Sequence, residues 1–193
     1  MGTIMSNDSK KTALDVLIEH NLDIRARIIY VQDGIDENVA AKFIKLLKYL
    51  DKTTGDIEVV LNSTGGCVTS GFAMHDVIKA CSNSVTVKVC GCAMSIATII
   101  LQAADTRVAS PYSRLMIHRG STEIGGDFLN VKKAMKEEEE LDKIMCDIYF
   151  ERIISTNPSF KRNQLEKLMD TDSYFSAQQA LDLGLIDEIE EDL

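Results

Sequence analysis

The chain has 193 residues, of which 45% are hydrophobic, and its 30 acidic and 21 basic side chains give a formal net charge of −9. A chain of this length can bury a sizeable core within one domain. The excess of negative charge argues against a nucleic-acid partner, because affinity for phosphates depends on clustered Lys and Arg.

No segment predicts a membrane span. The longest apolar run near a helix, Ile96 to Ala104, is interrupted by Thr98 and Gln102 and is much shorter than the roughly 20 residues that a bilayer requires. The polar stretch from Met1 to Lys11 lacks the apolar core of a secretory signal. We therefore expect no membrane partner and a cytoplasmic location.

The five cysteines are odd in number and stand within apolar segments: Cys67, Cys81, Cys90, Cys92 and Cys146. This pattern favours reduced thiols in the core over a disulfide framework. Cys90-Gly-Cys92 could supply half of a metal site, but no second cysteine pair or suitably spaced histidine pair completes it. We expect no bound metal.

Apolar strands alternate with amphipathic helices from residue 26 onward. Strands are predicted at Ala26–Val31, Ile57–Leu61, Val85–Val89 and Arg114–His118, and helices at Glu37–Leu50, Ser70–Cys81 and directly after Ser95. Repeated strand–helix–strand units predict parallel pairing with right-handed crossovers. The sequence therefore predicts an α/β fold with a parallel sheet core. Gly65-Gly66 and Gly91 mark predicted turns at strand ends, where active sites gather.

A long helix is predicted from Asp127 to Ile154, because apolar residues recur at helical spacing and no proline occurs from Asp127 until Pro158. The acidic run Glu137–Glu140 in its middle separates two apolar patches. A helix of this length is longer than a small domain is wide, so we interpret it as projecting outward to meet a neighbouring subunit. A helix buried within its own chain is the alternative.

A serine hydroxyl becomes a useful nucleophile only when a base takes its proton and a carboxylate orients that base. Ser95 stands between an apolar strand and a helix start, and His118 ends another strand. His20 lies in the amino-terminal part, and His75 lies beside Asp76 on a helix face, where a solvated or capping role is the ordinary interpretation. From spacing alone, one serine and one histidine give weak support for a catalytic pair.

Acyl transfer at a serine also needs N–H donors for the oxyanion that forms. The amide of Ile96 opens a helix directly after Ser95, where the helix dipole adds positive charge. The turn Asn62–Gly66 could provide a second donor, and a plain tight turn is the alternative interpretation of its two glycines.

Four segments in chain order resemble the proteolytic subunits of the Clp protease family, which are ATP-dependent serine endopeptidases (peptidase family S14). The segments are Leu61–Gly71, which contains Asn-Ser-Thr-Gly-Gly, then Gly91–Ser95, Pro111–His118, and Asp172–Ala177 followed by Ala180–Asp187. The resemblance spans about Arg27 to Ile189. It implies the fold that this family shares with crotonases, with repeated ββα units, a parallel sheet core and a projecting long helix.

The resemblance also implies a division of the chain. Residues 1–24 would be a divergent amino-terminal segment in the axial-loop and pore region. Residues 25–193 would form the serine peptidase domain, with the projecting handle helix at about residues 127–156.

The resemblance makes Ser95 the nucleophile, His118 the general base and then acid, and Asp172 the orienting carboxylate. Asp170 is a nearby competitor. Only Asp172 stands four residues before Ser176, as the family's aspartate does.

The oxyanion donors implied by the resemblance are the backbone N–H groups of Gly66 and Ile96. In the family, a strand corresponding to Arg119–Gly126 binds extended substrate through main-chain pairing. The residues that we expect to contact the substrate strand are Gly65, Cys67, Val68, Arg119 and Ser121.

Three departures from the family pattern stand close to these residues. Thr64 replaces the usual proline, Arg119-Gly120 replaces Gln-Pro, and the turn Ala104–Arg107 is two residues shorter than in typical members. None removes a catalytic group, but they alter the edges of the cleft, so substrate specificity can differ.

The resemblance implies the proteolytic subunit of an ATP-dependent Clp protease (EC 3.4.21.92), which cleaves unfolded polypeptides in protein quality control. It implies a homo-oligomer of two stacked heptameric rings, with the long helix forming the contact between rings. The implied partner is an AAA+ unfoldase of the ClpX, ClpA or ClpC type, which consumes the ATP. We expect no cofactor on the chain itself.

Alternatives remain at this point. A non-catalytic ring subunit or a crotonase-like acyl-CoA enzyme would not need Ser95, His118 and Asp172 in this order. A protease that works without an ATPase, for example in capsid maturation, stays open because the amino-terminal part matches the family poorly.

Overall fold

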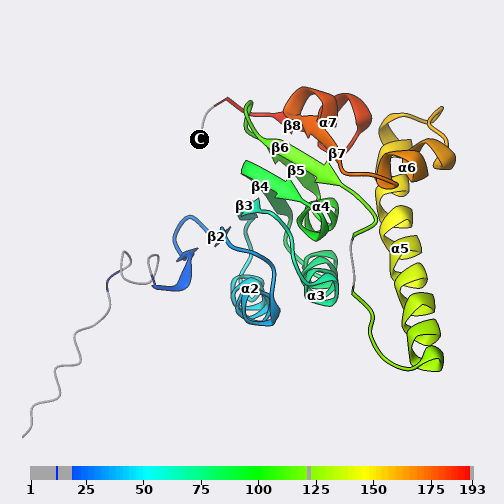
Figure 1. The fold of residues 1–193 in the computed structure, drawn as a ribbon. Coiled ribbons are helices and arrows are strands. Elements are labelled where there is room, and N and C mark those ends of the chain that lie inside the picture. The colour runs from blue at the N-terminus through cyan, green and yellow to red at the C-terminus, as the bar shows by residue number, and fades with distance from the viewer. Residues whose placement is uncertain (1–11, 13–18, 121–122, 192–193) are drawn as a thin grey trace, which may run out of the picture.

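The computed structural model describes Thr12, residues 19–120 and residues 123–191. Most of the predicted amino-terminal segment, and Ser121, lie outside the described residues, so the division at residue 24 stays a prediction. Within the described part of the chain, a mixed eight-stranded sheet forms the centre of the protein. Helices lie side by side along one face of this sheet, and a long helix stands at its side (Figure 1).

The strands of the sheet are β1 (Leu22–Asp23), β2 (Ile28–Val31), β3 (Ile57–Ser63), β4 (Val85–Met94), β5 (Thr106–Ala109), β6 (Arg114–Ile117), β7 (Ser173–Ser176) and β8 (Glu188–Ile189). The helices are α2 (Glu37–Leu50), α3 (Val68–Lys79), α4 (Ile96–Gln102), α5 (Phe128–Thr156), α6 (Arg162–Met169) and α7 (Ala177–Leu183). The predicted α/β class is confirmed, and the ββα repeat implied by the family stays a prediction.

The strand order is β1-β2-β3-β4-β5-β8, and β6 pairs with both β4 and β7. Pairing is parallel among β2, β3, β4, β5 and β8 and between β4 and β6. The strand–helix alternation predicts this direction for β2, β3, β4 and β6, but it did not indicate β5 or β8. β1 and β7 pair antiparallel with β2 and β6, respectively. The sequence pattern did not indicate these antiparallel strands.

Local sequence explains the helix boundaries. The Asp36 side chain accepts a hydrogen bond from the Val39 amide at 2.8 Å and caps the start of α2. The residues of α2 that face the sheet are buried: Ala40, Phe43, Leu47 and Leu50. Helix α4 is buried along its whole length, which fits its nearly continuous apolar sequence.

The third strand is longer than the sequence predicts. The pattern predicts a strand at Val85–Val89 and a turn at Gly91, but β4 continues to Met94. Gly91 adopts a φ of +106°, and the amide of the next residue, Cys92, donates to the Asn62 side chain at 3.1 Å. This irregularity lets β4 leave β5 and continue beside β6, so the strand reaches Ser95.

The long helix is confirmed at Phe128–Thr156, and Asp127 caps its start. Its two halves differ. The carboxyl-terminal half packs against the core through Met145, Tyr149 and neighbouring apolar residues. The amino-terminal half leaves Leu129 65% and Met135 54% exposed. The interpretation as an outward helix therefore fits the first half, and the intramolecular alternative fits the second.

All five cysteines are free. Only Cys146 is buried, so the expectation of core thiols is wrong for Cys67, which is exposed at the start of α3. Hydrogen bonds with Ser70 and Thr69 lower the pKa of the Cys67 thiol. Among the described residues, no helix has the length and apolar character needed to cross a membrane.

Candidate active site

Ser95 occupies the turn between β4 and α4. Its φ of 55° and ψ of −131° form a backbone conformation that side-chain-bearing residues rarely adopt. Such strain costs about 1–3 kcal/mol and persists only where the surroundings hold it. The Ser95 amide donates to the Met116 carbonyl at 2.9 Å, and the Ser95 carbonyl accepts from the Thr98 amide at 2.9 Å. A strained serine at a strand-to-helix turn is typical of an exposed nucleophile.

His118 is the first residue after β6, which runs beside the end of β4. Parallel pairing of Met94 with Met116 brings the ends of these strands together. His118 Nε2 lies 2.8 Å from Ser95 Oγ, and the His118 side chain is 19% exposed. The imidazole is therefore close enough to accept the serine proton directly.

Asp172 comes directly before β7, which runs antiparallel to β6. His118 Nδ1 lies 3.0 Å from Asp172 Oδ1. When Nδ1–H donates to this carboxylate, Nε2 is left as the acceptor for the Ser95 hydroxyl. The three side chains thus form one hydrogen-bonded series in the order that serine hydrolysis requires.

Asp170, the competing carboxylate, has a different partner. Arg119 Nε donates to Asp170 Oδ1 at 2.9 Å, and Arg119 Nη1 also pairs with Asp142 of α5. The hydrogen bond with Asp170 is the main cause that raises the pKa of Arg119. Asp170 is therefore held by a guanidinium, whereas Asp172 contacts the imidazole.

The Gly65-Gly66 turn packs directly against the Ser95 turn. A Cβ atom on Gly65 would lie 2.6 Å from the Met94 carbonyl oxygen and 2.8 Å from Ser95 Cβ, and Gly65 has a φ of +94°. Both facts require glycine. On the other side, the Ile35 amide donates to the Gly65 carbonyl at 2.8 Å. The turn is thus fixed between Ile35 and the serine.

The amides of Gly66 and Ile96 are the predicted oxyanion donors. Neither amide donates a hydrogen bond within the part of the chain that the structure describes. Ile96 is the first residue of α4, where an amide has no acceptor inside the helix. A Cβ on Gly65 would lie 3.3 Å from the Ile96 nitrogen, so the two segments are in close contact. Their role as oxyanion donors stays a prediction.

The predicted substrate-contacting residues differ in exposure and in whether their backbone amides already have hydrogen-bond partners. Cys67 is exposed and Val68 is half-buried, directly after the glycine turn. The Arg119 amide donates to the Met169 carbonyl at 3.0 Å, so this amide already has an acceptor within the chain. Ser121 lies outside the described residues. The substrate contacts of this group stay a prediction.

The strand expected at Arg119–Gly126 is absent from residues 119, 120 and 123–126, which are the described part of this segment. Gly120 and Gly126 have φ values of +88° and +134°, which interrupt an extended strand. A strand also needs a partner for its ladder of hydrogen bonds. The described part of this segment therefore forms no strand of the sheet, and its main-chain pairing with substrate stays a prediction.

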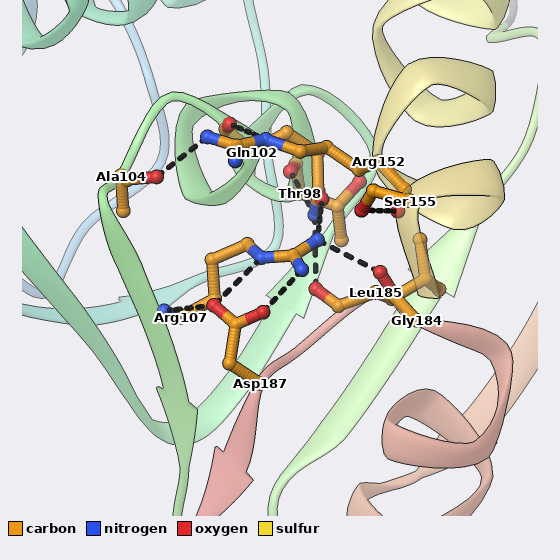
Figure 2. A network of polar contacts seen from close by, with 9 residues as sticks. All are labelled: Thr98, Gln102, Ala104, Arg107, Arg152, Ser155, Gly184, Leu185 and Asp187. Carbon is orange, nitrogen blue, oxygen red and sulfur yellow. Dashed lines mark hydrogen bonds and ion pairs between the residues drawn. The ribbon is translucent and has the colours of Figure 1, made fainter. Parts of the chain in front are cut away.

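A buried polar network anchors the far end of the helix that begins after Ser95 (Figure 2). Arg107 is 2% exposed, and its Nη1 donates to Gln102 Oε1 at 2.7 Å and to the Gly184 carbonyl at 2.8 Å. Its Nε donates to Asp187 Oδ2 at 3.0 Å. Burial opposes ionisation of Asp187, but the hydrogen bonds from Arg107 prevail and lower the pKa of Asp187.

Arg152 of α5 completes this network. Its Nε donates to the Gln102 carbonyl at 2.8 Å and its Nη2 to the Ala104 carbonyl at 2.6 Å. These carbonyls lie at the carboxyl end of α4, where a cation is favourable for the helix dipole. Burial lowers the pKa of Arg152. α4 is thus held at its carboxyl end by both α5 and the segment that contains Gly184 and Asp187.

Sequence reasoning missed these supporting residues, although a signal was present. Thr98 and Gln102 interrupt an otherwise apolar helix, and buried polar side chains require hydrogen-bond partners. Both have such partners. The partners come from distant parts of the chain, which spacing could not identify.

The remaining candidates do not join the site. His75 contacts its neighbour Asp76 at 3.1 Å, and its side chain is only 14% exposed, so of its two expected roles the solvated one is wrong and the capping one stays a prediction. Across residues 12, 19–120 and 123–191, no group of three His, Cys, Asp or Glu side chains is arranged to hold a metal ion.

Comparison with known proteins gives a consistent result. The family model for Clp protease matches residues 13–192. The ATP-dependent Clp protease proteolytic subunit 1 of Protochlamydia amoebophila is 35% identical over 178 residues, which cover 89% of this chain and 84% of that protein. The subunit 1 of Chlamydia abortus is 34% identical over 96% of both chains. The subunit 2 of Thermobifida fusca is 32% identical over 86% of this chain and 81% of that protein. The chain therefore belongs to the Clp protease family.

Proposed function

We propose that this chain is the proteolytic subunit of an ATP-dependent Clp protease and that it cleaves peptide bonds as a serine endopeptidase. The observation that carries this proposal is the series of hydrogen bonds from Ser95 Oγ to His118 Nε2 at 2.8 Å and from His118 Nδ1 to Asp172 Oδ1 at 3.0 Å. Relatives that are named as this subunit support it.

In the first step, Ser95 Oγ attacks the carbonyl carbon of the substrate peptide bond while His118 Nε2 takes the hydroxyl proton. The carbonyl π bond opens, and its electron pair moves to the oxygen to give a tetrahedral oxyanion. Asp172 stabilises the imidazolium that forms. When the intermediate collapses, the C–N bond breaks and His118 gives its proton to the leaving amine, which leaves an acyl group on Ser95.

In the second step, His118 takes a proton from water, and the resulting nucleophile attacks the acyl carbon. Collapse of this intermediate breaks the bond to Ser95 Oγ, and His118 returns the proton to the serine. The amides of Gly66 and Ile96 stabilise the oxyanion in both steps. Side chains and backbone amides supply all of this chemistry, so the proposal includes no cofactor on this chain.

We further propose that two heptameric rings of this chain stack through α5, whose first half leaves Leu129 and Met135 exposed. This arrangement supports a closed chamber that short peptides enter freely. Folded proteins then require an AAA+ unfoldase, which consumes the ATP. The five free thiols fit a reducing compartment such as the cytoplasm.

Covalent labelling tests the catalytic part of the proposal. The purified protein is treated with a fluorophosphonate, and the modified residue is mapped by mass spectrometry. We expect an adduct on Ser95, no adduct in Ser95→Ala, and strongly reduced labelling in Asp172→Ala. An assembled ring that remains unlabelled would mean that the protein has a non-catalytic role.

A second experiment tests the need for an ATPase. The protein is mixed with a folded and an unfolded protein substrate, with and without an AAA+ unfoldase and ATP. We expect the folded substrate to be degraded only when both are added. Degradation of the folded substrate without them would favour a processing protease that works alone.

A further inference from the structure

A chain of two buried hydroxyl groups leads from α5 to the carbonyl of the nucleophile. Thr98 is 0% exposed and Tyr149 is 1% exposed. Thr98 Oγ1 lies 2.6 Å from the Ser95 carbonyl oxygen and 2.5 Å from the Tyr149 hydroxyl. The proposed reaction assigns no role to either hydroxyl.

The direction of these hydrogen bonds follows from the groups themselves. The Ser95 carbonyl can only accept, so Thr98 must donate its one hydroxyl proton to it. Thr98 Oγ1 can then only accept from Tyr149, which donates its phenolic proton. Burial raises the pKa of Tyr149, so this proton is retained at any ordinary pH.

The acceptor of this chain belongs to the same peptide group as a predicted oxyanion donor. The carbonyl of Ser95 and the amide of Ile96 form one planar unit, and this peptide bond is trans. The C=O and N–H bonds of this peptide group therefore point in opposite directions along nearly the same line. Holding the Ser95 carbonyl thus fixes the direction in which the Ile96 amide donates.

The same contacts also strengthen the Ile96 amide as a donor. A carbonyl that accepts hydrogen bonds draws electron density from its own amide nitrogen, and bonds in series polarise one another. The Ser95 carbonyl accepts from the Thr98 hydroxyl and from the Thr98 amide at 2.9 Å. This peptide group also directly follows Ser95, whose strained backbone conformation the surrounding contacts must hold.

We propose that Thr98 and Tyr149 are positioning residues that orient and polarise the Ile96 amide for the oxyanion through the Ser95–Ile96 peptide group. This inference rests on the proposed serine peptidase function. It gives α5 a role at the catalytic centre, because Tyr149 of this helix contacts Thr98, which in turn contacts the Ser95 carbonyl. Thr98 and Tyr149 do not touch the substrate in this proposal.

The test compares Thr98→Val, which keeps the shape but removes the hydroxyl, with Thr98→Ser, which retains it. Loss of a direct oxyanion donor lowers kcat by roughly 10²–10³, so we expect loss of a group that acts one peptide bond away to lower kcat by about three- to tenfold. KM for a short fluorogenic peptide should stay within about twofold, because the oxyanion exists only after attack. Thr98→Ser should restore kcat.

A transition-state analogue separates positioning from general stability. A peptide boronate forms a tetrahedral adduct on the serine and places an oxygen in the oxyanion site. Its inhibition constant should rise in Thr98→Val by about the same factor as kcat falls. Tyr149→Phe keeps the buried ring and removes only its hydroxyl, so it should also lower kcat and raise the inhibition constant. It provides the test if Thr98→Val does not fold. Tyr49→Phe removes a hydroxyl from a half-exposed tyrosine on α2 and should change neither.

Wild-type labelling by a fluorophosphonate is measured in parallel, so that the two proposals can fail separately. An unlabelled wild-type ring would overturn the peptidase function. A labelled wild type, together with Tyr149→Phe and Thr98→Val variants that keep wild-type kcat and boronate affinity, would overturn the positioning role alone. The positioning role would also be overturned if KM changed with kcat while boronate affinity stayed constant.

Discussion

Ile117 of β6 stands directly opposite Ser173 of β7 in the antiparallel ladder. The residues that flank this pair, His118 and Asp172, leave the ladder together and meet at 3.0 Å. The imidazole of His118 and the carboxylate of Asp172 are therefore aligned by strand register. A one-residue slip of β7 would point the wrong side chain at the imidazole.

Replacement of Asp172 by Asn should lower kcat/KM for a fluorogenic peptide by about 10³–10⁴-fold, because an amide no longer selects the imidazole tautomer that accepts the serine proton. Asp170→Asn is the matched control. Asp170 contacts Arg119 and not His118, so its substitution should cost less than about tenfold. Equal losses in both variants would contradict the assignment of the carboxylate.

Gly65→Ala should reduce activity more than stability. The added Cβ would lie 2.6 Å from the Met94 carbonyl and 2.8 Å from Ser95 Cβ, so it must displace the Ser95 turn. A displacement near 1 Å costs about 100-fold in rate, and we expect a loss of that order in kcat/KM. At Gly34, a Cβ would make only an ordinary contact at 3.6 Å, so Gly34→Ala should retain activity. Full activity of Gly65→Ala would show that this turn tolerates a side chain.

The stability of the protein should fall in acid partly through Asp187. Its pKa is lower in the folded state, so its ion pair contributes stability that is complete above the unfolded-state value of about 3.9. The contribution disappears as the pH falls from there through the folded-state pKa. The difference in melting temperature between wild type and Asp187→Asn, recorded from pH 7 to pH 3, should begin to shrink below about pH 4. A constant difference across this range would exclude the carboxylate as the titrating group.

The size of the Asp187 effect at pH 7 follows from its partner. Arg107 is 2% exposed, and Asp187 is 38% exposed. Removal of one partner from a fully buried ion pair costs about 3–5 kcal/mol, and partial exposure reduces this cost, so we expect about 2 kcal/mol for Asp187→Asn. Urea unfolding at pH 7 measures this difference directly.

In the proposed assembly, Met135→Glu should split stacked rings into single rings. Met135 is 54% exposed on α5, close to the acidic run Glu137–Glu140, so a further carboxylate there removes apolar contact and adds repulsion between paired helices. Ser155→Glu adds the same charge near the other end of α5 and should leave the particle mass unchanged. Mass photometry distinguishes the two assemblies. An intact double ring in Met135→Glu would place the contact elsewhere.

The sequence predicted the parallel part of the fold well because each strand and helix there follows a simple hydrophobic period. Glu37–Leu50 was predicted with its observed bounds. The failures occur where pairing between distant segments decides the structure. Nothing near Gly91 indicates that β4 continues beside β6, and nothing near Ser173 indicates an antiparallel partner at Ile117.

For the candidate site, residue types and family order pointed to Ser95, His118 and Asp172, and the structure brings these side chains together. Their supports could not be predicted. Tyr149 looked like one more apolar residue of a long helix, and its hydroxyl contact with Thr98 spans 51 positions of the chain. Such contacts depend on how helices pack, which local periodicity does not encode.

The Arg107–Asp187 contact also has a consequence for biosynthesis. Translation delivers residues in order from the amino terminus, and domains begin to fold while the chain is still being made. Helix α4 is synthesised early, but Arg107, which holds the carboxyl end of α4, pairs with the late residue Asp187, and the His118 imidazole contacts the late residue Asp172. A nascent chain that ends before these residues therefore contains Ser95 without Asp172 and Asp187. In the proposed protease, proteolytic competence would arise only after these late residues have been made, which would protect neighbouring nascent proteins.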